Sequence, residues 1–136
     1  MAFVLDASVT LSWCLADESN PYAARVLARL TEEQALVPPI WPLEVTNALV
    51  VAQRRSRLSG EQLTVALSLL KHLDIEVERP VPVHLMGSTV DIAVVRALSV
   101  YDAAYVELAR RRGCPLATAD RRLAAAAASA GVEILG

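Results

Sequence analysis

The chain has 136 residues, 54% of them hydrophobic, and its 13 basic and 15 acidic side chains give a formal net charge of −2. At this length we expect one domain over residues 1–136, with a core that needs neither disulfides nor a structural metal. The near-neutral charge argues against a highly cationic nucleic-acid coat, and the high apolar content excludes intrinsic disorder.

Short apolar runs alternate with helical patterns along the chain. In chain order we predict a strand at 3–5, helices at 9–15 and 22–33, a strand at 35–37, helices at 42–57 and from 60 to about 73, a strand at 75–77, helices at 85–98 and 101–112, a strand at 116–118, a helix from 120 and a strand at 132–135. Pro38 should end the strand at 35–37, and Gly113 should lie just after the C-terminal end of the helix at 101–112. This alternation predicts an α/β fold, a three-layer α/β/α sandwich around a central, mostly parallel five-stranded sheet.

The two cysteines, Cys14 and Cys114, lie far apart and form no CxxC pattern. A disulfide framework or a zinc knuckle is therefore not expected, and a reducing, cytoplasmic location fits. The N-terminal segment lacks a basic region and reaches Asp6 too early for a signal peptide. Charged residues interrupt each apolar stretch well short of the ~18 residues of a membrane span, so we expect no membrane association.

Four acidic residues occupy the ends of predicted elements. Asp6 follows the first strand, Asp120 follows the fourth, and Asp102 begins a helix. Glu44 lies in the first turn of another helix, with Asn47 one turn later on the same face. Because an open parallel sheet binds ligands beyond the carboxyl ends of its strands, the four carboxylates are candidates to converge at one edge.

Each of these acids also has a structural explanation when it is taken alone. Asp102 and Asp120 are suited to cap helices, and Glu44 complements a helix dipole. Asp6 fits this explanation least, because a carboxylate directly after a buried strand is costly unless it is paired. If the four acids share one cleft, a divalent cation relieves their repulsion, and an all-oxygen ligand set suits Mg²⁺ or Mn²⁺.

Four segments, in order, resemble the motifs of the PIN-domain ribonucleases. They are residues 4–9 (VLDASV), 42–49 (PLEVTNAL), 101–109 (YDAAYVELA) and 116–123 (LATADRRL). Each motif is weak alone, but the four together match that family in order, spacing and total length. A stand-alone domain of this size looks like the VapC toxins of VapBC toxin–antitoxin pairs.

The resemblance implies a Mg²⁺- or Mn²⁺-dependent endoribonuclease that hydrolyses RNA, with transfer RNA the first expectation and ribosomal RNA the second. Asp6, Glu44, Asp102 and Asp120 match the acidic quartet. Asp6 and Asp102 would be the principal metal ligands and Asp120 a further one. Glu44 would bind a second metal or orient the attacking water.

Further positions are assigned supporting roles by the same resemblance. Ser8 and Thr118 match small hydroxyl positions near the metal, and Asn47 matches a position that supports Glu44. Arg121 and Arg122 adjoin Asp120, which makes them the best candidates for binding RNA phosphates. With only 4% aromatic residues, the composition does not indicate a base-stacking platform.

The resemblance also implies partners, namely a homodimer and a VapB-like antitoxin whose C-terminal segment lies across the active-site groove. Trp13 and Trp41 are either anchors near that groove or ordinary core residues, and we place core first. The alternative to a nuclease is a non-catalytic binding module that keeps the fold but not the chemistry. A phosphate-accepting receiver domain, a DxDxT phosphatase and a nucleotide-binding enzyme each lack their required motif.

Overall fold

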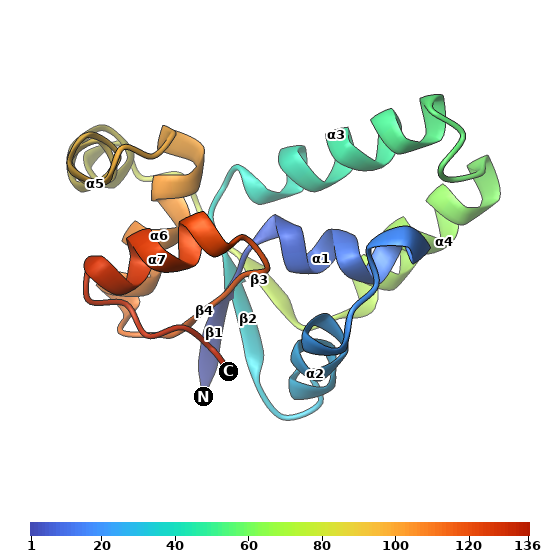
Figure 1. Ribbon diagram of the computed structural model, residues 1–136, viewed down its shortest axis with the longest axis horizontal. Coiled ribbons are helices and arrows are strands. Elements are labelled where there is room, and N and C mark those ends of the chain that lie inside the picture. The colour runs from blue at the N-terminus through green and yellow to red at the C-terminus, as the bar shows by residue number, and fades with distance from the viewer.

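The computed structural model describes residues 1–136 and has a parallel sheet at its centre (Figure 1). Its four strands are β1 (Ala2–Leu5), β2 (Gln34–Val37), β3 (Ile75–Val77) and β4 (Leu116–Ala117), in the order β3-β2-β1-β4. Val4 of β1 pairs with Leu36 on one side and with Leu116 on the other, and every pairing is parallel. The predicted α/β class with a parallel sheet is confirmed.

The prediction of a fifth strand over 132–135 is wrong. That segment forms only an isolated parallel bridge between Ile134 and Leu116. Two backbone hydrogen bonds hold it, from Leu116 to Glu133 and from Leu135 to Leu116. Because β4 itself is only two residues long, it offers no longer ladder for this segment to pair with.

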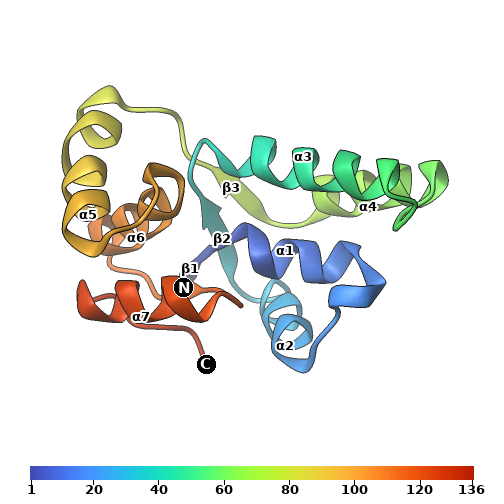
Figure 2. The same ribbon diagram turned by 45° about the horizontal axis from the view of Figure 1, so that its top comes forward.

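Seven α-helices and two short helical turns surround the sheet. They are α1 (Ala7–Cys14), η1 (Ala16–Glu18, a 3₁₀ turn), α2 (Pro21–Arg29), α3 (Trp41–Arg54), α4 (Gly60–His72), η2 (His84–Ser88, a π-helical turn), α5 (Thr89–Arg96), α6 (Val100–Arg112) and α7 (Arg121–Ser129). Helices α1 to α4 lie on one side of the sheet and α5 to α7 on the other, as Figures 1 and 2 both show. The chain therefore forms the predicted three layers.

Covering both faces of the sheet buries most of β1 and β2 and all of β4, which explains their apolar runs, whereas the edge strand β3 is largely exposed. Phe3, Val4 and Leu5 have no exposed surface, and they belong to a core cluster of 30 buried residues. Helix α6 is part of this core, because its residues from Ala103 to Ala109 are all buried. A helix buried on nearly every side holds its first turn, which carries Asp102, in a fixed place.

The C-terminal ends of α5 and α6 both have local explanations in the backbone. The single helix predicted over 85–98 is split into η2 and α5, and it ends at Ala97, which has a left-handed φ of 55°. Gly113, at φ 64°, ends α6 as predicted, since glycine enters this conformation without a Cβ penalty.

The carboxyl ends of β1 and β4 lie side by side, because Leu5 pairs with Ala117.

Candidate active site

Asp6 lies at the carboxyl end of β1, directly before α1, and its side chain is 6% exposed. The carboxylate does not cap α1. Instead its Oδ2 accepts hydrogen bonds from Ser8 Oγ at 2.6 Å and from Thr118 Oγ1 at 2.8 Å. Both of these side-chain hydrogen bonds go to Oδ2, and neither occupies Oδ1.

The Ser8 and Thr118 hydroxyl groups that bind Asp6 also link the end of β1 to the segment after β4. Ser8 Oγ accepts the backbone N–H of Ala119 at 3.0 Å, and Thr118 Oγ1 accepts that of Asp120 at 3.0 Å. The structure therefore places both predicted hydroxyl residues in contact with Asp6. Each is oriented by a backbone donor, so its proton points to the carboxylate.

Glu44 lies in the first turn of α3 and is supported by a residue that the sequence analysis did not single out. Tyr105 has no exposed surface, and its hydroxyl donates to Glu44 Oε1 at 2.6 Å. Asn47, expected to support Glu44, is exposed and makes no hydrogen bond to it. A signal was present in the sequence, because Tyr105 follows Asp102 by three residues and so shares its helix face.

Asp102 and Asp120 differ in how far helix capping explains them. The cap of α6 is Ser99, whose Oγ accepts the backbone N–H of Asp102 at 3.0 Å, so the Asp102 carboxylate has no capping role. Asp120 does cap α7, since its Oδ1 accepts the N–H groups of Arg122 at 2.9 Å and Leu123 at 3.2 Å. That capping role leaves Oδ2 of Asp120 free on an exposed side chain.

The pKa values of these carboxylates show that the acids interact electrostatically. Burial raises the pKa of Asp6, and the charge of Asp102 adds to that rise, although the hydrogen bonds from Ser8 and Thr118 oppose it. Burial also raises the pKa of Glu44. The charges of Asp6 and Asp102 raise it further, and the hydrogen bond from Tyr105 lowers it. The structure thus brings three acids from three separate elements into one electrostatic cluster.

Asp120 joins the cluster through Asp102. Burial raises the pKa of Asp102, the charge of Asp120 raises it further, and the charge of Arg122 lowers it. Arg122 is the one cation among the charges that act on these three raised pKa values. The cluster therefore carries an excess of negative charge that the chain itself does not neutralise.

The two arginines predicted to bind RNA take different positions. Arg122 is fixed, because its Nη2 donates to the backbone carbonyl of Ala97 at 2.9 Å, in the strained turn between α5 and α6. Arg121 is exposed and forms no ion pair or hydrogen bond through its side chain. Arg121 is thus the freer of the two to meet a phosphate, whereas Arg122 also positions the start of α6.

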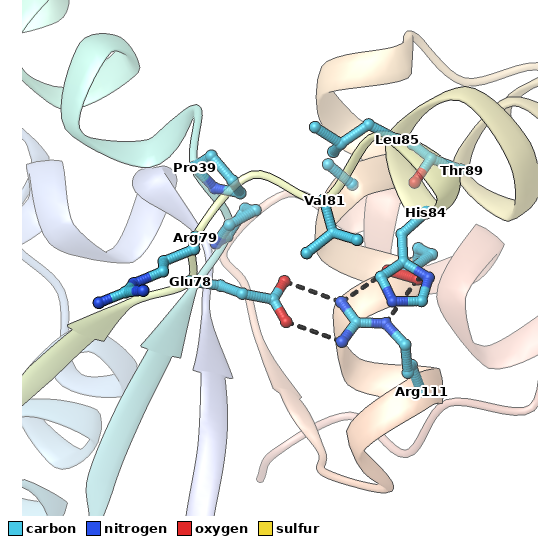
Figure 3. Close-up of a pocket in the computed structure, with 11 residues that line it drawn as sticks. Pro39, Glu78, Arg79, Val81, His84, Leu85, Thr89 and Arg111 are labelled. Carbon is cyan, nitrogen blue, oxygen red and sulfur yellow. Dashed lines mark hydrogen bonds and ion pairs between the residues drawn. The ribbon is translucent and has the colours of Figure 1, made fainter.

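A third arginine, Arg111, belongs to a different place in the fold, shown in Figure 3. Its guanidinium binds both carboxylate oxygens of Glu78, at 2.7 and 2.8 Å, and its Nε donates to the buried Glu107 at 2.7 Å. This network ties the end of β3 to α6, around a pocket of about 10 Å³ that has room for about one water molecule. Arg111 therefore holds α6 to the end of β3, and its guanidinium is not free to bind a phosphate.

The oxygen cluster has the right donor chemistry for a hard cation but not yet the spacing. No group of three or more His, Cys, Asp or Glu side chains lies close enough together to hold a metal ion as they stand. Asp6 is buried, Glu44 and Asp102 are half-buried, and Asp120 is exposed with its Oδ1 engaged in capping α7. A bound cation therefore requires the carboxylates to move closer together.

Comparison with known proteins identifies the family. The family model described as PIN domain matches residues 3–129.
The chain belongs to the PIN domain family.
Within this PIN family, Ribonuclease VapC3 of Pyrobaculum aerophilum is 31% identical over 128 residues, covering 91% of this chain and 93% of that protein. Ribonuclease VapC3 of Mycobacterium tuberculosis is 34% identical over 129 residues, covering 93% of this chain and 88% of that protein.

A solved structure shows the same PIN fold. It is that of VapBC2 from Rickettsia felis bound to a DNA fragment from their promoter, with a TM-score of 0.64 at 12% identity over 88% of this chain and 89% of that one. At this identity the likeness concerns the fold alone. No helix of this PIN domain combines the length and apolar character needed to cross a bilayer.

Proposed function

We propose that this PIN domain is a Mg²⁺- or Mn²⁺-dependent endoribonuclease, the toxin of a toxin–antitoxin pair, which hydrolyses phosphodiester bonds of transfer or ribosomal RNA. The observation that carries the proposal is the cluster of Asp6, Glu44 and Asp102, three carboxylates with raised pKa values among which Arg122 is the one opposing cation, acting on Asp102. Membership of the PIN family and two relatives named ribonucleases support it.

The residues present fit a divalent cation by their chemistry. All candidate ligands are carboxylate oxygens, which hard ions prefer, and the side chains of Ser8 and Thr118 both bind Oδ2 of Asp6 and not its Oδ1. Asp6 and Asp102 would hold the ion, with Asp120 as a further ligand. Glu44 would serve a second ion or act on water.

The chemistry supplied by such an ion is a lowered pKa of water and relief of negative charge on the phosphate. The protein's own part is to orient its acids. Ser8 and Thr118 hold Asp6 through its Oδ2, which fixes the orientation of the carboxylate. Tyr105 fixes Glu44 through Oε1, and Glu44 would accept a proton from the attacking water.

The proposed partners follow from the family and from the exposed surface. A VapB-like antitoxin would cover the acidic cluster, and a basic side chain from it would compete with the cation for the carboxylates. A homodimer would bury apolar side chains that are exposed in the single chain, among them Val94 and Val95 of α5.

The test is cleavage of end-labelled total cellular RNA by purified, antitoxin-free protein in Mg²⁺, in Mn²⁺ and in EDTA. The proposal expects defined fragments that require the metal and disappear in Asp6→Asn. Asp91→Asn is the matched control, because Asp91 is an exposed aspartate of α5 that takes no part in the cluster. Fragments that persist in EDTA or in Asp6→Asn would refute the proposed chemistry.

The alternative of a non-catalytic binding module gives a different result in a second measurement. Titration calorimetry with Mn²⁺ should show binding that Asp6→Asn weakens. A folded protein that binds no Mn²⁺ and leaves all RNA intact would favour the binding module.

A further inference from the structure

One aromatic side chain stands apart from the other aromatic residues. The chain has two tryptophans, three tyrosines and one phenylalanine. Phe3, Trp41 and Tyr105 are buried, and Trp13 and Tyr22 donate hydrogen bonds to backbone carbonyls inside the fold. Tyr101 alone is exposed, to 59%, and no hydrogen bond restrains its hydroxyl.

Tyr101 borders an apolar hollow of about 270 Å³. The hollow is lined by Pro39, Ile40, Leu85, Val100, Tyr101 and Ala104, and no charged residue lines it. An exposed tyrosine over a hollow without charge is suited to a flat apolar ring. It is not suited to a phosphate, which needs cations or backbone donors.

The hollow lies beside the acidic cluster. Ile40 accepts the backbone N–H of Glu44 at 3.0 Å, so the hollow is one helical turn from that acid. On the other side, Tyr101 directly precedes Asp102, and Ala104 directly precedes Tyr105. The hollow is therefore built from the starts of α3 and α6, the two helices that carry Glu44 and Asp102.

We infer that this hollow binds one nucleobase of the RNA substrate, stacked on Tyr101, while the phosphate of the same or the neighbouring nucleotide lies at the acidic cluster. The inference rests on the proposed nuclease function and adds a base-binding site to it. A base is one sugar away from its phosphate, which matches a hollow one turn away from the acids. Stacking on an aromatic ring is how single-stranded RNA is held where few bases are read by hydrogen bonds.

This inference changes the expectation drawn from composition. The low aromatic content argued against a stacking platform, yet a single ring is sufficient when it lies next to the reaction centre. The hollow also differs from the outer face of α5, where Val94 and Val95 are more than two thirds exposed and line no hollow of this kind. That outer face is the better candidate for contact with a second copy.

The test measures RNA binding in the Asp6→Asn background, which removes cleavage. The probes are a uridine octamer with one 2-aminopurine, moved along the chain, and the same octamer with an abasic ribose at that position. We expect fluorescence of the 2-aminopurine to be quenched at one position. Tyr101→Ala should weaken binding about 10-fold and abolish the quenching, whereas Tyr101→Phe stays within about twofold.

The abasic octamer gives the decisive comparison. It has no base to stack on Tyr101 at that position, so Tyr101→Ala should leave its affinity unchanged. Val65→Ala, at an exposed apolar residue of α4 outside the hollow, is the control and should change the binding of neither probe. Equal losses for the base-containing and abasic octamers would overturn the inference. So would an Asp6→Asn chain that binds neither octamer.

Sedimentation equilibrium separates the other possible occupants. Unchanged RNA affinity with loss of a dimer in Tyr101→Ala would assign the face to a second copy. Unchanged RNA affinity with unchanged mass would leave the hollow to an apolar side chain of a protein partner. Either result overturns the inference but leaves metal-dependent RNA cleavage by the unsubstituted chain intact, and the proposed function is tested separately by the cleavage assay.

Discussion

Replacing Tyr105 by phenylalanine removes one hydroxyl and leaves the buried ring in place. That hydroxyl donates to Glu44 Oε1 at 2.6 Å, which is the short distance of a charge-assisted hydrogen bond. A hydrogen bond to a charged group contributes ~1.5–3 kcal/mol, and since Glu44 is only half-buried we expect about 2 kcal/mol. For a chain of this length that loss corresponds to a fall in Tm of about 7 °C.

The assay is urea denaturation at pH 8, where Glu44 is kept ionised, in the wild-type and the Glu44→Gln backgrounds. Glutamine still accepts a hydrogen bond but carries no charge, so Tyr105→Phe should cost only about 1 kcal/mol there. Tyr22→Phe is the matched control, because the Tyr22 hydroxyl donates to the neutral carbonyl of Leu135 at 2.7 Å. Its cost should be about 1 kcal/mol in both backgrounds.

The result that would refute this reasoning is an equal loss for Tyr105→Phe in both backgrounds. The hydroxyl would then stabilise the fold without sensing the charge of Glu44. It would have no claim to hold that carboxylate for catalysis.

Three further predictions concern the stability of the metal-free protein. Because burial and Asp102 raise the pKa of Asp6, its ionised form destabilises the fold, so Asp6→Asn should raise the free energy of unfolding at pH 7. That gain should shrink as the pH falls toward 3.8, the ordinary pKa of an aspartate, since protonation removes the same charge, and a gain independent of pH in urea titrations would contradict this. Arg111→Leu should cost about 3 kcal/mol in chemical denaturation, because it removes the arginine partner of the buried Glu107, whereas replacing the exposed Arg110 should cost less than about 0.5 kcal/mol. Gly113→Ala should lower stability by about 1 kcal/mol through its φ of 64° alone, since no atom lies within 4 Å of the added Cβ, and an unchanged Tm would count against that cause.

The sequence by itself determined the layout of this protein. Apolar runs such as Phe3-Val4-Leu5 and the helical stripes between them specify a parallel α/β sheet, because their periods fit only those elements. The fifth strand was over-predicted, since the pattern at 132–135 says nothing about the length of the strand it would pair with. The positions of Asp6 and Asp120 after strands also point to one edge of the sheet.

Only the tertiary structure decided which side chains act on those acids. Tyr105 reaches Glu44 across 61 positions of sequence and Thr118 reaches Asp6 across 112, and no local pattern encodes such contacts. The structure likewise separated Arg111, held by Glu78 and Glu107, from the free Arg121, although both appear in sequence as members of basic clusters. Periodicity is a property of neighbours along the chain, whereas hydrogen bonds and charge interactions depend on distances in space that packing of the core sets.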